Sequence, residues 1–233
     1  MSVNRKTFFA LWVMCIVGSL SVLPYVMHLD LFPPEVSRLN IVILTVVQSS
    51  ILFGVVCWLS SVIVPRTDLA PFPPDKKCKG LFYPGMVSGA LAGVLIVLLD
   101  RTVFQSSSLS GEHPPFWAGA LASIYGAVNE EVLLRLFLFS LVYFLLRKFF
   151  RSKSRQVFLW ITNVFVAFIF GLGHLPAALK LADPTAFEIS RVLILNGIPG
   201  IVFGRLYWTN GFWTAMAAHF TADLIIHVLF ALV

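Results

Sequence analysis

The chain has 233 residues, of which 58% are hydrophobic and only 12% are charged, and its mean hydropathy is +0.89. A soluble domain of this length would carry about 25% charged residues, so a soluble globular protein is excluded. The apolar runs are unbroken and not alternating, which excludes an outer-membrane β-barrel. The composition therefore predicts an all-α fold, a polytopic bundle of transmembrane helices.

The net charge of +6 does not indicate a nucleic-acid partner. Lys and Arg collect between the apolar runs, where the positive-inside rule places them, and this predicts a lipid bilayer as the surroundings. Three cysteines, Cys15, Cys57 and Cys78, show no metal or redox spacing. Cys15 and Cys57 fall inside apolar runs and are interpreted as small hydrophobic residues.

A membrane-crossing helix needs about 20 mainly apolar residues. Seven runs are candidates: Phe8–Met27, Arg38–Val64, Tyr83–Leu99, Phe116–Leu146, Val157–Gly173, Val192–Trp208 and Phe212–Leu232. The fourth run is too long for one straight crossing. It is either a single tilted helix or a short interfacial helix followed by a span, with Gly126 as a plausible break. We therefore expect about seven spans, with eight as the alternative.

The first run follows Arg5 and Lys6, as the core of a signal peptide would. Its apolar stretch is longer than a typical signal core, and no clear small-x-small cleavage site follows it. An uncleaved first span is therefore favoured.

Charge predicts the orientation of the bundle. With the amino terminus in the cytoplasm, the inner segments hold 12 basic residues and the outer segments hold 4, with Arg135 inside a span. This asymmetry favours a cytoplasmic amino terminus, and seven spans then place the carboxyl terminus outside. No connecting segment is long enough for a soluble domain. We expect one membrane-embedded domain, with three spans in residues 1–115 and a functional core in residues 116–233.

Glu130, Glu131 and Arg135 are the only ionisable acids or bases between Pro115 and Leu146. Asp, Lys or Arg costs about 2.5–3.5 kcal/mol at the centre of a membrane helix, so such residues usually face a protein interior and mark function. Consecutive helical residues point about 100° apart, so the two glutamates are not expected to face the same spot. Glu131 and Arg135 have the spacing of a pair, which leaves Glu130 free as a general acid or base. The alternative is a buried ion-pair network that only holds helices together.

His174 closes the fifth predicted span, and Pro176 is expected to end that helix. Gly171 and Gly173 leave room for the close approach of another helix. A lone histidine at the end of a span is more often interfacial than catalytic. Only the other ionisable residues in the apolar spans make a catalytic role for His174 worth considering.

His219 and Asp223 lie one helical turn apart, about 6 Å along the axis, and face the same side of the last span. Asp223 could orient the His219 ring, or both could ligate a metal. The alternative is a buried pair that fixes helix packing. His227 lies two turns beyond His219 and is interpreted as interfacial.

Together these residues could hydrolyse a bond, because hydrolysis needs an activated water and a stabilised oxyanion. Glu130 with His174 or His219 could activate the water, and a histidine could donate to the oxyanion. The same set, Glu130, His174, His219 and Asp223, could instead bind zinc. There is no H-E-x-x-H spacing, so the zinc signal is weak.

The pattern resembles the CAAX protease and bacteriocin-processing family, which includes the type II CAAX prenyl endopeptidases. The residues that carry the resemblance are Glu130-Glu131-x-x-x-Arg135, then Phe170-x-x-x-His174, then His219-x-x-x-Asp223, helped by the stretch Gly200–Trp213. The resemblance covers about Phe116–Val233. It implies intramembrane endopeptidase activity on a membrane-anchored protein or peptide.

By similarity, Glu130 would activate water with help from His174, and His219 with residue 223 would stabilise the oxyanion. Glu131 and Arg135 would be supporting. The family often has Asn at the position of Asp223, and an ionised Asp cannot donate to an oxyanion. Asp223 would then orient His219, ligate a metal, or act while protonated. The resemblance leaves a glutamate mechanism without cofactor and a zinc mechanism both open.

The short chain without added domains looks bacterial or archaeal, where prenyl tails are not expected. The expected substrates are therefore peptide precursors or sorting helices anchored in a prokaryotic cytoplasmic membrane, and the site is expected midway or facing outward. One alternative is a non-catalytic scaffold or immunity protein of the same family. The other is a proton-coupled transporter, which the absence of internal repeats disfavours.

Overall fold

The computed structural model describes residues 5–72, 78–109, 114–150, 154–181 and 185–232. These residues are overwhelmingly helical and contain no strand, which confirms the predicted all-α fold. The α-helices are α1 (Arg5–Ser21), α2 (Leu23–His28), α3 (Arg38–Ile63), α4 (Cys78–Thr102), α5 (Phe116–Tyr125), α6 (Ser140–Phe149), α7 (Arg155–Leu181), α8 (Ala186–Asn210) and α9 (Phe212–Leu224). Five shorter segments complete the order: the 3-10 turns η1 (Val64–Arg66) and η5 (Phe230–Leu232), and the π-helical segments η2 (Gly126–Glu130), η3 (Val132–Phe139) and η4 (Ile225–Leu229).

Local sequence explains where several helices begin. The Ser37 side chain caps α3 by accepting a hydrogen bond from the Asn40 amide. Thr185 and Glu188 form a reciprocal capping box at the start of α8. Gly211 separates α8 from α9 at a φ of 102°, a conformation that glycine adopts without the steric cost of a side chain.

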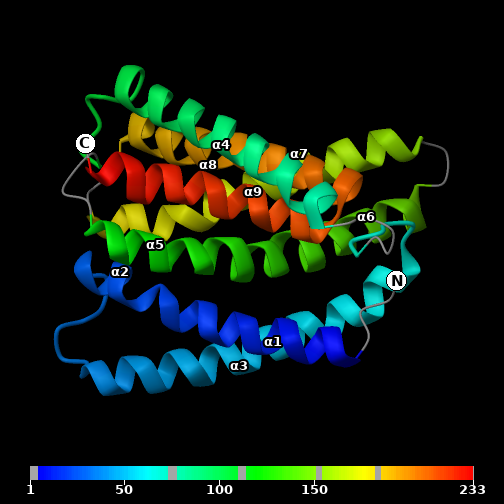
Figure 1. Ribbon diagram of the computed structural model, residues 1–233, viewed down its shortest axis with the longest axis horizontal. Coiled ribbons are helices and arrows are strands. Elements are labelled where there is room, and N and C mark those ends of the chain that lie inside the picture. Colours follow the sequence, from blue (N-terminus) through cyan, green and yellow to red (C-terminus); the bar gives the residue numbers. More distant parts are fainter. Residues whose placement is uncertain (1–4, 73–77, 110–113, 151–153, 182–184, 233) are drawn as a thin grey trace.

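The helices are packed in layers on either side of one central helical run (Figure 1). This run comprises α5, η2, η3 and α6. On one side of it, α1 packs against α5 and η2, and α3 packs against α1, η3 and α6. Helices α4, α7, α8 and α9 lie on the other side, with α4 against α9 and α7 against α8. The start of α1 and the last described turn, η5, lie at opposite ends of the bundle.

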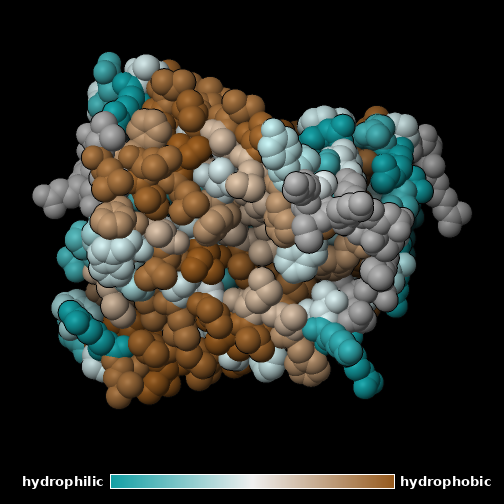
Figure 2. Space-filling model, viewed as in Figure 1, coloured by the Kyte–Doolittle hydropathy of each residue, from teal (hydrophilic) through white to brown (hydrophobic). Residues whose placement is uncertain are grey.

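Within the described residues, six helical segments are long and apolar enough to cross a membrane, so the protein is an integral, multi-pass membrane protein. They are Arg5–His28, Arg38–Arg66, Gly80–Thr102, Arg155–Leu181, Ala186–Asn210 and Phe212–Leu229. Hydrophobic residues form a broad band across these helices, between hydrophilic residues at both ends (Figure 2). The central run is not among the six, because Glu130, Glu131 and Arg135 interrupt its apolar sequence. The count of seven spans therefore stays a prediction.

Two expectations about helix ends were wrong. Gly126 does not break the fourth run, because residues 116–149 are helical throughout and Gly126 has helical backbone angles. The run is thus a single helix, about 50 Å long against a hydrocarbon core of about 30 Å. Pro176 does not end α7 either, because the helix continues to Leu181. Membrane helices tolerate proline, since neighbouring groups re-satisfy the backbone atom that it frees.

Close packing of α4 on α9 fixes the helix that carries His219. Gly85, Gly89 and Gly93 of α4 face the α9 backbone so closely that a Cβ on Gly89 would lie 2.1 Å from the Ala218 carbonyl oxygen. Small residues at such spacing let two helices approach until their backbones touch. His219 follows Ala218 directly, so this contact positions the histidine.

Candidate active site

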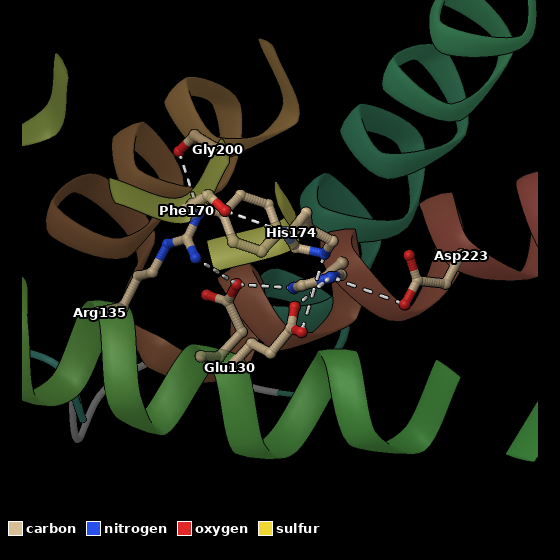
Figure 3. A network of polar contacts seen from close by, with 8 residues as sticks. Glu130, Arg135, Phe170, His174, Gly200 and Asp223 are labelled. Atoms are coloured by element: carbon tan, nitrogen blue, oxygen red, sulfur yellow. Dashed lines mark hydrogen bonds and ion pairs between the residues drawn. The ribbon is translucent and has the colours of Figure 1, made fainter. Parts of the chain in front are cut away.

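A buried ion pair lies at the centre of the bundle. Glu131 and Arg135 are both fully buried, and Glu131 Oε1 lies 3.0 Å from Arg135 Nη1, the pairing that their spacing predicts. Arg135 Nη2 also donates to the Gly200 carbonyl of α8 at 3.1 Å. The guanidinium lies over the rings of Phe170 and Phe203, at 5.2 and 5.7 Å from their centroids. Arg135 therefore joins the central run to α7 and α8 (Figure 3).

Glu131 also orients His219. His219 Nδ1 donates to Glu131 Oε1 at 2.8 Å, and the Phe203 ring stacks on the imidazole with centroids 4.7 Å apart. The sequence suggested Asp223 for this orienting contact, but Asp223 Oδ2 lies 3.6 Å from the other nitrogen, Nε2. The hydrogen bond to Glu131 fixes the tautomer of His219 and turns Nε2 toward the remaining acids.

Glu130 is the more exposed of the two glutamates. Its side chain is 20% exposed, with Oε2 3.6 Å from His219 Nε2 and Oε1 4.0 Å from His174 Nε2. The expectation that the two glutamates cannot face the same spot was wrong, because both reach the His219 ring, at opposite nitrogens. Glutamate side chains are long, and the π-helical segments η2 and η3 change the angular spacing that an α-helix would impose.

His174 and Asp223 complete the cluster from α7 and α9. His174 Nδ1 donates to the Phe170 carbonyl at 2.9 Å, which leaves Nε2 toward Glu130. Asp223 is partly exposed, at 16%, and lies against Gly126, where a Cβ would be 2.4 Å from Asp223 Oδ2. Gly126 thus makes room for the acid, a function that its interpretation as a helix break missed.

All six residues singled out in the sequence lie in one cluster: Glu130, Glu131, Arg135, His174, His219 and Asp223 (Figure 3). His227 lies in η4, where its Nδ1 is 3.3 Å from the Tyr25 hydroxyl of α2. Sequence reasoning assigned no role to Phe203, although it lies in the stretch Gly200–Trp213 that helps the resemblance. It also assigned none to Asn129, whose signal is an amide inside an apolar span.

The zinc alternative gains no support from the geometry. Within the described parts of the chain, no three His, Cys, Asp or Glu side chains are arranged so that they could hold a metal ion. His219 Nδ1 already donates to Glu131, so only Nε2 of this ring faces Glu130 and Asp223.

These features define a multi-pass helical membrane protein with a partly buried cluster of carboxylates and histidines. Residues 112–225 match the family model described as "Type II CAAX prenyl endopeptidase Rce1-like". The match confirms, over these residues, the resemblance to the CAAX protease family that the sequence motifs predicted. No curated protein and no solved structure matches the chain significantly.

Proposed function

We propose that the protein is an intramembrane endopeptidase that hydrolyses a peptide bond of a membrane-anchored protein or peptide. The family supports protease chemistry. One observation carries the assignment of the base: Glu130 is a partly exposed carboxylate between two histidine Nε2 atoms, 3.6 and 4.0 Å away. The gap to His174 is too long for a direct hydrogen bond and suits a bridging water.

In this mechanism Glu130 removes a proton from that water, and His174 helps to orient it. The resulting hydroxide attacks the carbonyl carbon of the scissile bond and gives a tetrahedral oxyanion. Protonated Glu130 then returns its proton to the leaving amine, and the peptide bond breaks. A proton-transfer group of this kind contributes about 10²- to 10⁴-fold to the rate.

His219 is the proposed oxyanion donor. As an imidazolium it donates Nδ1–H to Glu131 and presents Nε2–H to the developing negative charge. Asp223 lies 3.6 Å from the same nitrogen and is proposed to orient it, or to donate itself when protonated. Glu131 and Arg135 are proposed to support the site without touching substrate, because both side chains are fully buried.

The test is cleavage in proteoliposomes with two probes, a farnesylated CAAX-box peptide and an unprenylated transmembrane peptide, with new termini identified by mass spectrometry. The wild type is expected to cleave one of them and Glu130→Gln neither. Glu35→Gln, which alters an exposed glutamate between α2 and α3, is the matched control and should cleave like the wild type. Equal cleavage by Glu130→Gln and the wild type would remove Glu130 from the chemistry.

Metal analysis of the same preparations tests the alternative mechanism. The glutamate mechanism predicts cleavage by protein that carries no stoichiometric zinc. Stoichiometric zinc that is lost in His174→Ala or His219→Ala would transfer the water-activating function from Glu130 to the metal.

A further inference from the structure

Asn129, the residue directly before Glu130, points to a helix that lies outside the family match. Its side chain is fully buried, and its Nδ2 donates to the Cys15 carbonyl and to Ser19 Oγ, both at 2.8 Å. Both acceptors belong to α1, whereas the family match begins at residue 112. The turn that carries Glu130 is thus tied by two hydrogen bonds to the amino-terminal part of the chain.

The orientation of this amide is determined by its partners. The Cys15 carbonyl can only accept, so Nδ2 must face it and Oδ1 must point the other way. Oδ1 then faces Gly18, where an added Cβ would lie 2.0 Å from it. Among the described residues Oδ1 has no hydrogen-bond partner. Burying an acceptor without a partner costs free energy, so this contact does not itself hold α1 against Asn129. The two hydrogen bonds from Nδ2 offset that cost and hold α1 in place.

The tie falls where the helix is irregular. Asn129 and Glu130 are the last two residues of the π-helical segment η2. π-helical segments are rare in proteins, and those that occur often lie at functional sites. A π-helical turn does not repeat the regular α-helical ladder, so bonds from a side chain help to determine its position. Glu130 needs such support, since its own nearest polar contacts are 3.6 and 4.0 Å away.

We infer that Asn129 is a positioning residue that holds Glu130 in line by anchoring η2 to α1 through Cys15 and Ser19, so that α1 is part of the working site. The inference rests on the proposed function. It predicts that a change in α1 that disturbs this contact lowers kcat, although α1 contributes no side chain to the acid–histidine cluster.

The test is a double-mutant cycle in proteoliposomes with the cleaved probe. Gly18→Ala puts a methyl group against Asn129 Oδ1, and Asn129→Ala removes both bonds. Each is expected to lower kcat about 10- to 100-fold with KM within about twofold, because small misplacements of a catalytic group cost this much. The double variant should lower kcat no further than Asn129→Ala alone, because the methyl group added by Gly18→Ala then has no Asn129 Oδ1 to overlap with. Gly54→Ala is the control, because its Cβ would make ordinary contact with Trp12 at 3.4 Å.

Asn129→Asp separates positioning from folding. A protonated carboxyl group can donate to the Cys15 carbonyl, whereas a carboxylate cannot. The variant's kcat should therefore fall with rising pH along a limb that the wild type lacks, with the folded fraction constant. Parallel pH profiles, or wild-type kcat in both Gly18→Ala and Asn129→Ala, would overturn the inference. If Glu130→Gln cleaves normally, the proposed function fails instead. If Glu130→Gln is inactive while Gly18→Ala and Asn129→Ala both keep wild-type kcat, only the inference about α1 fails.

Discussion

Glu130 and Glu131 are neighbours in the chain but occupy different surroundings. Glu131 is fully buried, 3.0 Å from Arg135 Nη1 and 2.8 Å from His219 Nδ1. Glu130 is partly exposed, and its contacts with His174 and His219 are 4.0 and 3.6 Å long. We therefore expect Glu131 to support the fold and Glu130 to be available for chemistry.

This difference predicts opposite effects on stability. Glu131→Gln leaves Arg135 buried without a counter-ion, and breaking a buried pair costs about 3–5 kcal/mol. Glu130→Gln removes no close contact and should change the free energy of unfolding by less than about 1 kcal/mol. Thermal unfolding of both variants in the same lipid or detergent measures the contrast. Equal melting temperatures for the two variants would contradict the assignment of Glu131 to the supporting network.

At the scale of the elements, the site depends on how closely α4 approaches α9. The glycines of α4 place the two backbones in contact, and α9 carries both His219 and Asp223. Backbone atoms cannot move aside as flexible side chains can, so a methyl group at this interface separates the helices.

Gly89→Ala is therefore expected to be destabilising and to lower cleavage. Its Cβ would lie 2.1 Å from the Ala218 carbonyl oxygen, and overpacking of this kind costs about 1–3 kcal/mol. Gly80→Ala is the control in the same helix, because a Cβ there meets nothing within 4 Å. The two measurements are the melting temperature and the cleavage rate. A Gly89→Ala protein as stable as Gly80→Ala would show that the α4–α9 contact does not determine the position of α9.

Sequence patterns predicted where the helices lie in the chain better than they predicted the side-chain contacts between helices. Long apolar runs identify membrane helices because the bilayer fixes their length, and spacing on one helix found the Glu131–Arg135 pair. Spacing could not show that His219 donates to Glu131, because the two lie 88 positions apart in the chain. It also assumed α-helical geometry where the chain is π-helical, and so misplaced the directions of Glu130 and Glu131.

At the scale of the whole molecule, basic residues gather at one end of the bundle. The end at which α3 finishes and α7 begins carries Arg66, Arg147 and Arg155, and Arg155 pairs with Asp68 at 2.8 Å. The Tyr143 hydroxyl also donates to Asp68, at 2.6 Å. Partial burial opposes the charged form of Asp68, but these hydrogen bonds and the arginine outweigh burial and hold its pKa below the ordinary value. The basic end is the predicted cytoplasmic end.

Labelling of single cysteines tests this orientation. In a cysteine-free background, Glu35→Cys and Ser154→Cys place thiols on exposed residues, one between α2 and α3 and the other directly before α7. The α2–α3 connection and the start of α7 lie at opposite ends of the bundle (Figure 1). A membrane-impermeant maleimide applied to intact cells is expected to label position 35, and position 154 only after permeabilisation. The reverse pattern would place the amino terminus outside.

The most direct test of the central claim is the single-turnover cleavage rate of Glu130→Gln relative to the wild type, at equal concentrations of folded protein in the same lipid. An amide cannot take the proton of water, so the rate constant should fall about 10²- to 10⁴-fold while probe binding and stability are retained. A rate constant equal to that of the wild type would show that the carboxylate between His174 and His219 does not perform the chemistry.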